Sequence, residues 1–178
     1  VRVSTVRYTS GNLKEDMESG AVDIALGLLP QLRAGFFQRR LFRQRYVCMF
    51  RKGHPSASNP ITLKQFSSLE HVGVLAANSG HGEVDTLLDR AGIHRHIRLT
   101  VPHFIAVGHI LQGTDLIATL PQRFAMRCEK PFNLVTSPHP VKLPEIAINM
   151  LWHAKYNRDS ANMWIRQLMV ELFSDDHA

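Results

Sequence analysis

Apolar and polar positions follow two different periods along this chain. Alternation with a period of two, or a short apolar run, indicates strands at residues 1–8, 22–28, 41–50, 71–75, 97–101, 115–120, 132–135 and 146–152. Apolar spacings of three and four indicate helices at residues 12–20, 62–66, 84–91, 103–111, 121–127 and 159–173. Because strands and helices alternate, the pattern predicts an α/β fold.

The order of these elements predicts two lobes. Residues 1–28 read as a βαβ unit of a parallel sheet, and residues 71–120 continue with a βαβαβ rhythm. Loops near residues 30–40 and 137–144 separate the two series, so the chain is expected to cross between the lobes twice. We expect a ligand cleft where the lobes meet. The boundaries are assigned as 1–36 with 143–178 for lobe I, and 37–142 for lobe II.

The turn at residues 75–85 is the first candidate binding element, because it links a predicted strand to a predicted helix start. Asn78 and Ser79 are residue types that cap helices, and the two glycines of the turn leave backbone N–H groups open to close approach. His81 adds a side-chain donor. Such a helix start can seat a carboxylate, although an ordinary capped turn fits the same residues.

The positive charge of the chain is concentrated in one segment. The net charge is +6, yet seven basic residues and no acidic residue lie between Arg33 and Lys52, so the rest of the chain is close to neutral. Aromatic and aliphatic residues interleave with these arginines, which favours a solvated strand face over a nucleic-acid-binding arm. Direct contact with nucleic acid stays the alternative.

The composition limits the class of protein. With 44% hydrophobic and 20% charged residues in 178, the chain is expected to be globular, and it has no apolar run long enough to span a membrane. Its start lacks the layout of a signal peptide. Cys48 and Cys128 have no CxxC spacing, so reduced thiols and a cytoplasmic location are expected.

Enzyme and metal motifs are not found in the sequence. There is no GxSxG, HExxH or GxGxxG pattern, so we expect no catalytic activity and no cofactor. His94 and His96 are separated by one residue, but no acidic or sulfur ligand lies beside them, so a metal site is not expected.

Three motifs resemble the effector domain of LysR-type transcriptional regulators. Residues 13–27, with Gly20 and Asp23, are similar to the family's helix-Gly-x-x-Asp-strand signature. His54-Pro55 resembles its His-Pro pair, and residues 115–121 resemble its Gly-x-Gly-Ile-Ala-x-x-Pro stretch. The resemblance is closest to the NahR, NagR and DntR branch, which responds to salicylate and related aromatic acids.

This resemblance implies a fold and a set of ligand contacts. The fold is that of type 2 periplasmic-binding proteins, with two Rossmann-like lobes and the inducer between them. Arg123 would pair with the carboxylate, Phe42 and Ile148 would hold the ring, and polar contacts would come from Gln44 and the turn. The carried-over ligand-binding residues are Phe42, Gln44, Asn78, Ser79, His81, Arg123 and Ile148.

The resemblance also implies partners. A dimer or tetramer is expected, as is a bacterial regulator that switches genes of aromatic degradation. DNA would be bound only through an N-terminal winged helix-turn-helix, which, with the first strand and helix of the effector domain, would precede Val1. A transport solute-binding protein is the alternative with the same fold, and a small α/β enzyme is a weaker one. The upstream sequence would distinguish the first two.

Overall fold

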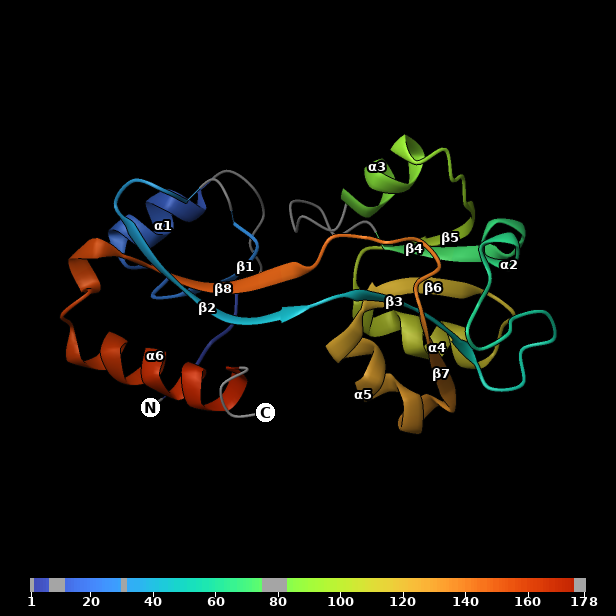
Figure 1. The fold of residues 1–178 in the computed structure, drawn as a ribbon. Coiled ribbons are helices and arrows are strands. Elements are labelled where there is room, and N and C mark those ends of the chain that lie inside the picture. The colour runs from blue at the N-terminus through green and yellow to red at the C-terminus, as the bar shows by residue number, and fades with distance from the viewer. Residues whose placement is uncertain (1, 7–11, 30–31, 75–82, 175–178) are drawn as a thin grey trace. The chain divides into compact units, whose positions relative to one another are not determined.

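The computed structural model describes residues 2–6, 12–29, 32–74 and 83–174. These residues divide into two compact units, which are described separately. Unit 1 contains the chain up to Arg43 and from Ala147 onwards, and unit 2 contains most of the chain from Gln44 to Ile146. Figure 1 shows both units with their elements labelled.

Unit 1 is a three-stranded sheet with a helix on each face. Its strand order is β1-β8-β2, from β1 (Ala25–Gly27), β8 (Ile146–His153) and β2 (Phe36–Gln44). Consecutive side chains of a strand point to opposite faces. Leu151 accordingly packs with α1 (Leu13–Ser19), whereas Met150 packs with α6 (Ser160–Phe173), so the two helices cover opposite faces (Figure 1).

The first part of unit 1 differs from the sequence prediction. Residues 2–6 form no strand and are exposed, including Val3 at 65% and Val6 at 69%. The predicted strand 22–28 is reduced to β1, which pairs antiparallel with β8. A strand is stabilised only by a paired neighbour, and among the described residues β1 has β8 alone. The predicted parallel βαβ unit at residues 1–28 is therefore wrong for the part that is described.

Unit 2 is a five-stranded mixed sheet. Its order is β5-β4-β6-β3-β7, formed by β3 (Tyr46–Arg51), β4 (Glu70–Val74), β5 (His96–Val101), β6 (Ile117–Pro121) and β7 (Leu134–Pro138). β4 pairs parallel with β5 and β6, as the predicted βαβαβ rhythm requires. β3 pairs antiparallel with β6 and β7, so it inserts between strands that are later in sequence.

Helices cover both faces of the unit 2 sheet. The connection from β5 to β6 contains a short 3₁₀ helix (Phe104–Ala106) and α4 (Val107–Gln112), and α5 (Gln122–Phe132) follows β6. These helices form an apolar layer with the side chains of Val47 and Met49 on β3. The other helices, α2 (Leu63–Ser68) and α3 (Glu83–Arg90), lie on the opposite side of the sheet in Figure 1.

Local signals placed several helix ends correctly. Thr62 and Gln65 form a capping box at the start of α2. Gly20, with φ of 92°, ends α1, and the Asp159 carboxylate accepts the N–H of Asn162 at the start of α6. α5, in contrast, runs to Phe132, beyond the predicted end at residue 127 and into the predicted strand 132–135.

The boundaries of the compact units fall between Arg43 and Gln44 and between Ile146 and Ala147. The first lies at the end of β2, which begins at Phe36 and joins β8 in the sheet of unit 1. The assignment of lobes to residues 1–36 with 143–178 and to residues 37–142 stays a prediction.

Candidate functional site

The carboxyl edge of the parallel strands in unit 2 collects polar side chains. β4 ends at Val74, β5 at Val101 and β6 at Pro121. Loops that follow parallel strands gather at this edge, and open α/β sheets bind ligands there. The residues at this edge therefore form the candidate site.

Gln44 and Arg123 meet at this edge. Gln44 is the last residue of β2, and Arg123 is the second residue of α5. The backbone N–H of Arg123 donates to Oε1 of Gln44 over 3.2 Å. Because Oε1 is engaged, the side-chain amide of Gln44 presents its N–H donors to other partners. This hydrogen bond uses the backbone of Arg123, so it holds the Gln44 amide at the first turn of α5.

A second contact fixes the same junction. The N–H of Gln122 donates to the carbonyl oxygen of Arg45 over 2.9 Å, and Nε of Arg45 donates to Oε1 of Gln122 over 3.0 Å. The start of α5 is thus tied to the segment between β2 and β3 by both backbone and side chains. This rigid junction sets where the Arg123 side chain begins.

Phe42 and Ile148 lie in unit 1. Phe42 is on β2 and Ile148 is on the neighbouring strand β8, and both are half-buried. Phe42 packs against the cluster of Leu41, Met150 and Trp152, so part of its ring serves the core of unit 1. Apolar and charged residues alternate in exposure at this point of β2, as the sequence pattern predicts, since Arg43 is exposed and Phe42 is half-buried.

The remaining predicted residues, Asn78, Ser79 and His81, lie outside the described residues. Of the seven predicted contacts, the structure brings Gln44 and Arg123 together in unit 2 and places Phe42 and Ile148 on adjacent strands of unit 1. The assignment of all seven as ligand contacts stays a prediction.

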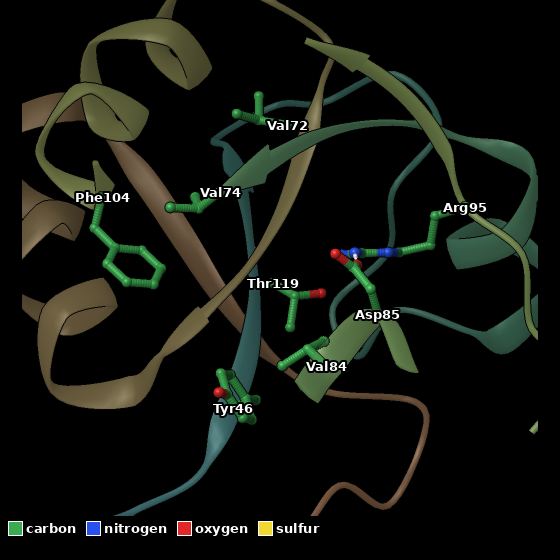
Figure 2. Close-up of a pocket in the computed structure, with 8 residues that line it drawn as sticks. All are labelled: Tyr46, Val72, Val74, Val84, Asp85, Arg95, Phe104 and Thr119. Atoms are coloured by element: carbon green, nitrogen blue, oxygen red, sulfur yellow. Dashed lines mark ion pairs between the residues drawn. The ribbon is translucent and has the colours of Figure 1, made fainter. Parts of the chain in front are cut away.

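The sequence analysis missed a polar cavity in unit 2. Figure 2 shows it beside the ion pair between Arg95 and Asp85. The cavity has a volume of about 20 Å³ and is lined by Tyr46, Val72, Val74, Val84, Asp85, Arg95, Phe104 and Thr119. The side chain of Arg95 is only 8% exposed, whereas that of Asp85 is 48% exposed. The sequence contained only a weak indication of this cavity, because Arg95 lies between two histidines in a segment that was predicted to be a basic turn.

Three buried groups close to Arg95, namely His71, His139 and Cys48, are uncharged at neutral pH. Burial lowers the pKa of His71 to about 4 and that of His139 to about 4. Burial raises the pKa of Cys48 to about 12. It also lowers the pKa of Arg95, although a guanidinium stays protonated in proteins. Among the described residues, Asp85 forms an ion pair with the buried side chain of Arg95.

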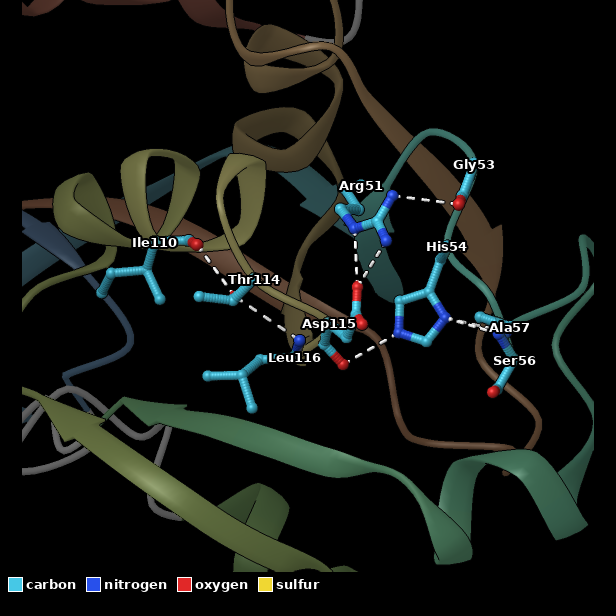
Figure 3. Close-up of polar contacts among 9 residues, drawn as sticks. All are labelled: Arg51, Gly53, His54, Ser56, Ala57, Ile110, Thr114, Asp115 and Leu116. Carbon is cyan, nitrogen blue, oxygen red and sulfur yellow. Dashed lines mark hydrogen bonds and ion pairs between the residues drawn. The ribbon is translucent and has the colours of Figure 1, made fainter.

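His54, in the His-Pro pair, has a structural role. Its Nε2 donates to the carbonyl oxygen of Asp115 over 2.8 Å, and its Nδ1 accepts the N–H groups of Ser56 and Ala57 (Figure 3). Arg51 pairs with the Asp115 carboxylate at 2.6 Å. These contacts connect the end of β3 to the turn before β6, so the motif that resembles the family signature secures the sheet.

Among the described residues, no group of three His, Cys, Asp or Glu side chains is arranged to hold a metal ion. Cys48 and Cys128 are both free and buried. Within the same residues, none of the helices has the length and apolar character needed to cross a bilayer.

Comparison with known proteins gives consistent results. Residues 1–174 match the profile of the LysR substrate binding domain. The HTH-type transcriptional activator NagR of Ralstonia sp is 74% identical over 175 residues, covering 98% of this chain and 58% of NagR. The HTH-type transcriptional activator NahR of Pseudomonas putida is 60% identical over 173 residues, covering 97% of this chain and 58% of NahR. The chain thus spans less than two thirds of these relatives.

Solved structures share the fold. A probable transcriptional regulator from Pseudomonas aeruginosa is 27% identical with a TM-score of 0.78, covering 90% of this chain and 53% of that one. The regulatory domain of MexT, a transcriptional activator in the same organism, is 25% identical with a TM-score of 0.74, covering 91% and 79%.

Proposed function

This chain belongs to the LysR substrate-binding domain family, and on that premise we propose that it is the inducer-sensing part of a bacterial transcriptional regulator. The family resemblance expected from the sequence is confirmed by the match over residues 1–174. The two relatives described above are transcriptional activators, so neither an enzyme nor a transport protein is favoured.

The inducer we propose is a small aromatic acid similar to salicylate. The observation that carries this proposal is the hydrogen bond between Arg123 and Gln44 at the carboxyl edge of the unit 2 sheet. A guanidinium binds a carboxylate through two parallel hydrogen bonds, and an amide donor beside it suits a ring hydroxyl. Phe42 and Ile148 are proposed to contact the ring, and Asn78, Ser79 and His81 to add polar contacts.

In this mechanism the inducer stabilises one arrangement of two lobes, assigned to residues 1–36 with 143–178 and residues 37–142. A ligand shifts a conformational equilibrium only as far as it binds one state better than the other. The shift would be transmitted to DNA through a dimer or tetramer, with DNA contacts made outside this chain. Genes of aromatic degradation are the proposed targets.

The test is calorimetric titration of salicylate into the full-length protein and into Arg123→Ala. Hydrogen bonds to charged groups contribute about 1.5–3 kcal/mol, so affinity should fall roughly 10- to 150-fold. Arg127→Ala is the matched control, because Arg127 is exposed one turn further along α5.

Each outcome has a distinct meaning. Loss of affinity in Arg123→Ala but not in Arg127→Ala supports Arg123 as the carboxylate anchor. Equal binding by wild type and Arg123→Ala would transfer the anchor role to the turn of Ser79 and His81. No binding by wild-type protein would exclude salicylate, and benzoates, phenols and non-aromatic acids would be screened next.

A further inference from the structure

The first two residues of α5 lie ahead of the apolar layer that holds the rest of this helix. Ala125 and Cys128 are buried in that layer, and the half-buried Phe124 packs against it. Gln122 and Arg123 come before these residues and are only half-buried. Apolar packing therefore fixes the helix from Phe124 onwards, and polar contacts hold the two residues before it.

This helix start is capped by a distant segment of the chain. The first N–H groups of a helix lack intrahelical acceptors, and the N-cap side chain usually accepts one of them. The N-cap residue of α5 is Pro121, which makes no such bond. The carbonyl oxygen of Arg45 accepts the N–H of Gln122 over 2.9 Å instead. Oε1 of Gln44 accepts the next N–H, that of Arg123, over 3.2 Å.

These contacts continue the antiparallel register of β3 and β6 beyond the ends of both strands. In this register Arg45 lies opposite Gln122, and the next pair is Gln44 with Arg123. The first pair is closed from both directions, because Nε of Arg45 also donates to Oε1 of Gln122 over 3.0 Å. In the second pair a flexible side chain takes the place of the backbone acceptor. The closed pair therefore restrains the residue beside it, which is Arg123.

The position of this residue matters for binding a carboxylate. A guanidinium binds a carboxylate through two parallel hydrogen bonds only when both groups are aligned. Such contacts work when neighbouring groups hold the binding side chain within about 0.5 Å of its productive position. The arginine side chain is long, so a small shift at its Cα is carried to the guanidinium.

We propose that Gln122 and Arg45 are positioning residues of the inducer site, which fix the origin of the Arg123 side chain without contacting the inducer. The inference rests on the proposed function, since it takes Arg123 as the carboxylate anchor. Arg45 is exposed and Gln122 is half-buried, so their side-chain contact adds little to the core of unit 2. Its loss should therefore lower affinity for the inducer more than it lowers stability.

The test is calorimetric titration of salicylate into the full-length protein and into Gln122→Met. Methionine is as long as glutamine and uncharged, but it cannot accept the N–H of Arg45. The affinity should fall about two- to tenfold, as for the loss of one hydrogen bond, with the urea midpoint unchanged. Gln112→Met, at an exposed glutamine that ends α4, is the matched control. In an Arg123→Ala background Gln122→Met should have no further effect, because no anchor remains to be positioned.

The outcomes separate this inference from the proposed function. A loss of affinity in Gln122→Met that is absent from Gln112→Met and from the Arg123→Ala background supports the positioning role. Wild-type affinity in Gln122→Met, together with weaker binding by Arg123→Ala, overturns the inference alone. A loss that persists in the Arg123→Ala background also overturns it, since Gln122 would then contact the inducer directly. A loss that comes with a lower urea midpoint overturns it as well, because the role would be structural.

Two results would remove the proposed function and the inference together. These are wild-type protein that does not bind salicylate, and Arg123→Ala that binds it as tightly as wild type does. If circular dichroism shows that Gln122→Met is unfolded, Arg45→Lys is scored by the same criteria. Lysine keeps the positive charge but lacks the planar guanidinium, so a loss of affinity would not come from charge.

Discussion

Replacing Asp85 by Asn should destabilise unit 2, because it leaves the Arg95 guanidinium buried without a counter-charge. Removing one partner of a buried ion pair typically costs about 3–5 kcal/mol. Here Arg95 is 8% exposed and Asp85 is 48% exposed, so water screens one end of the pair. We therefore expect a loss of about 2–4 kcal/mol in the free energy of unfolding.

Replacing the other partner of the ion pair, Arg95, should lower the free energy of unfolding by less than replacing Asp85. Arg95→Met keeps most of the side-chain volume and leaves Asp85 with access to water, so we expect a loss of about 1 kcal/mol. The double variant should be more stable than Asp85→Asn alone, because no buried cation remains. This asymmetry between the two partners is the signature of a desolvated arginine.

The assay is urea unfolding followed by far-UV circular dichroism and by tryptophan fluorescence. Both tryptophans, Trp152 and Trp164, lie in unit 1, so fluorescence reports whether the change reaches that unit. Asp89→Asn is the control, because Asp89 is on the same helix, is 67% exposed and lies 3.6 Å from Nδ1 of the exposed His94. If Asp85→Asn and Asp89→Asn shift unfolding equally, the reasoning about Arg95 is refuted.

Two further predictions concern unit 2. The folded-state pKa of His71 and of His139 lies near 4, below the ordinary 6.5, so the unfolded chain binds more protons between these values. Stability should therefore be unaffected by these groups above pH 6.5 and fall by up to about 3 kcal/mol per histidine as pH drops to 4, as measured by urea midpoints. Gly108→Ala should cost about 1–3 kcal/mol in the same assay, because its Cβ would lie 2.6 Å from the Phe132 ring, whereas Gly113→Ala meets nothing within 4 Å.

Local structure could be predicted where the determining contacts are close in sequence. The capping box of α2 requires only Thr62 and Gln65, and the end of α1 requires only Gly20. Whether a strand pairs parallel or antiparallel cannot be predicted from nearby residues, because it depends on which distant strand is its partner. The pairing of β1 with β8 joins Ala25 to Leu151, and nothing near Ala25 specifies it.

The length of α5 shows a second limit of local reasoning. Pro131 predicts an earlier end of the helix, but it lies in the last turn, where it removes only one intrahelical bond. Asn133 then ends the helix with φ of 52°, and its N–H donates to the carbonyl oxygen of Lys130 over 3.4 Å. A left-handed asparagine is an effective helix end, which the sequence analysis did not weigh against the following strand pattern.

The candidate site could be predicted only in part. Gln44 and Arg123 were identified through the family resemblance, and the structure joins them by a hydrogen bond. The cavity was missed because the burial of Arg95 follows from the packing of α3 against the sheet. A lone arginine in a polar segment is usually exposed, so the sequence around it gave no reason to expect otherwise.

The two faces of the unit 2 sheet differ in polarity. The layer with α4 and α5 is apolar and contains residues such as Val47, Leu111 and Ala125. The other side of β3 and β6 presents Cys48 and Thr119, with Arg95 close to Cys48 and the neutral His139 bonded to Thr119. Replacing buried ionic groups by well-packed apolar ones is often neutral or stabilising, so stability alone does not require this polar layer. Departures from an apolar core tend to coincide with sites of function. The proposed contacts Gln44 and Arg123 adjoin the ends of β3 and β6, the two strands that carry this polar layer, since Gln44 precedes Tyr46 by two residues and Arg123 follows Pro121 by two.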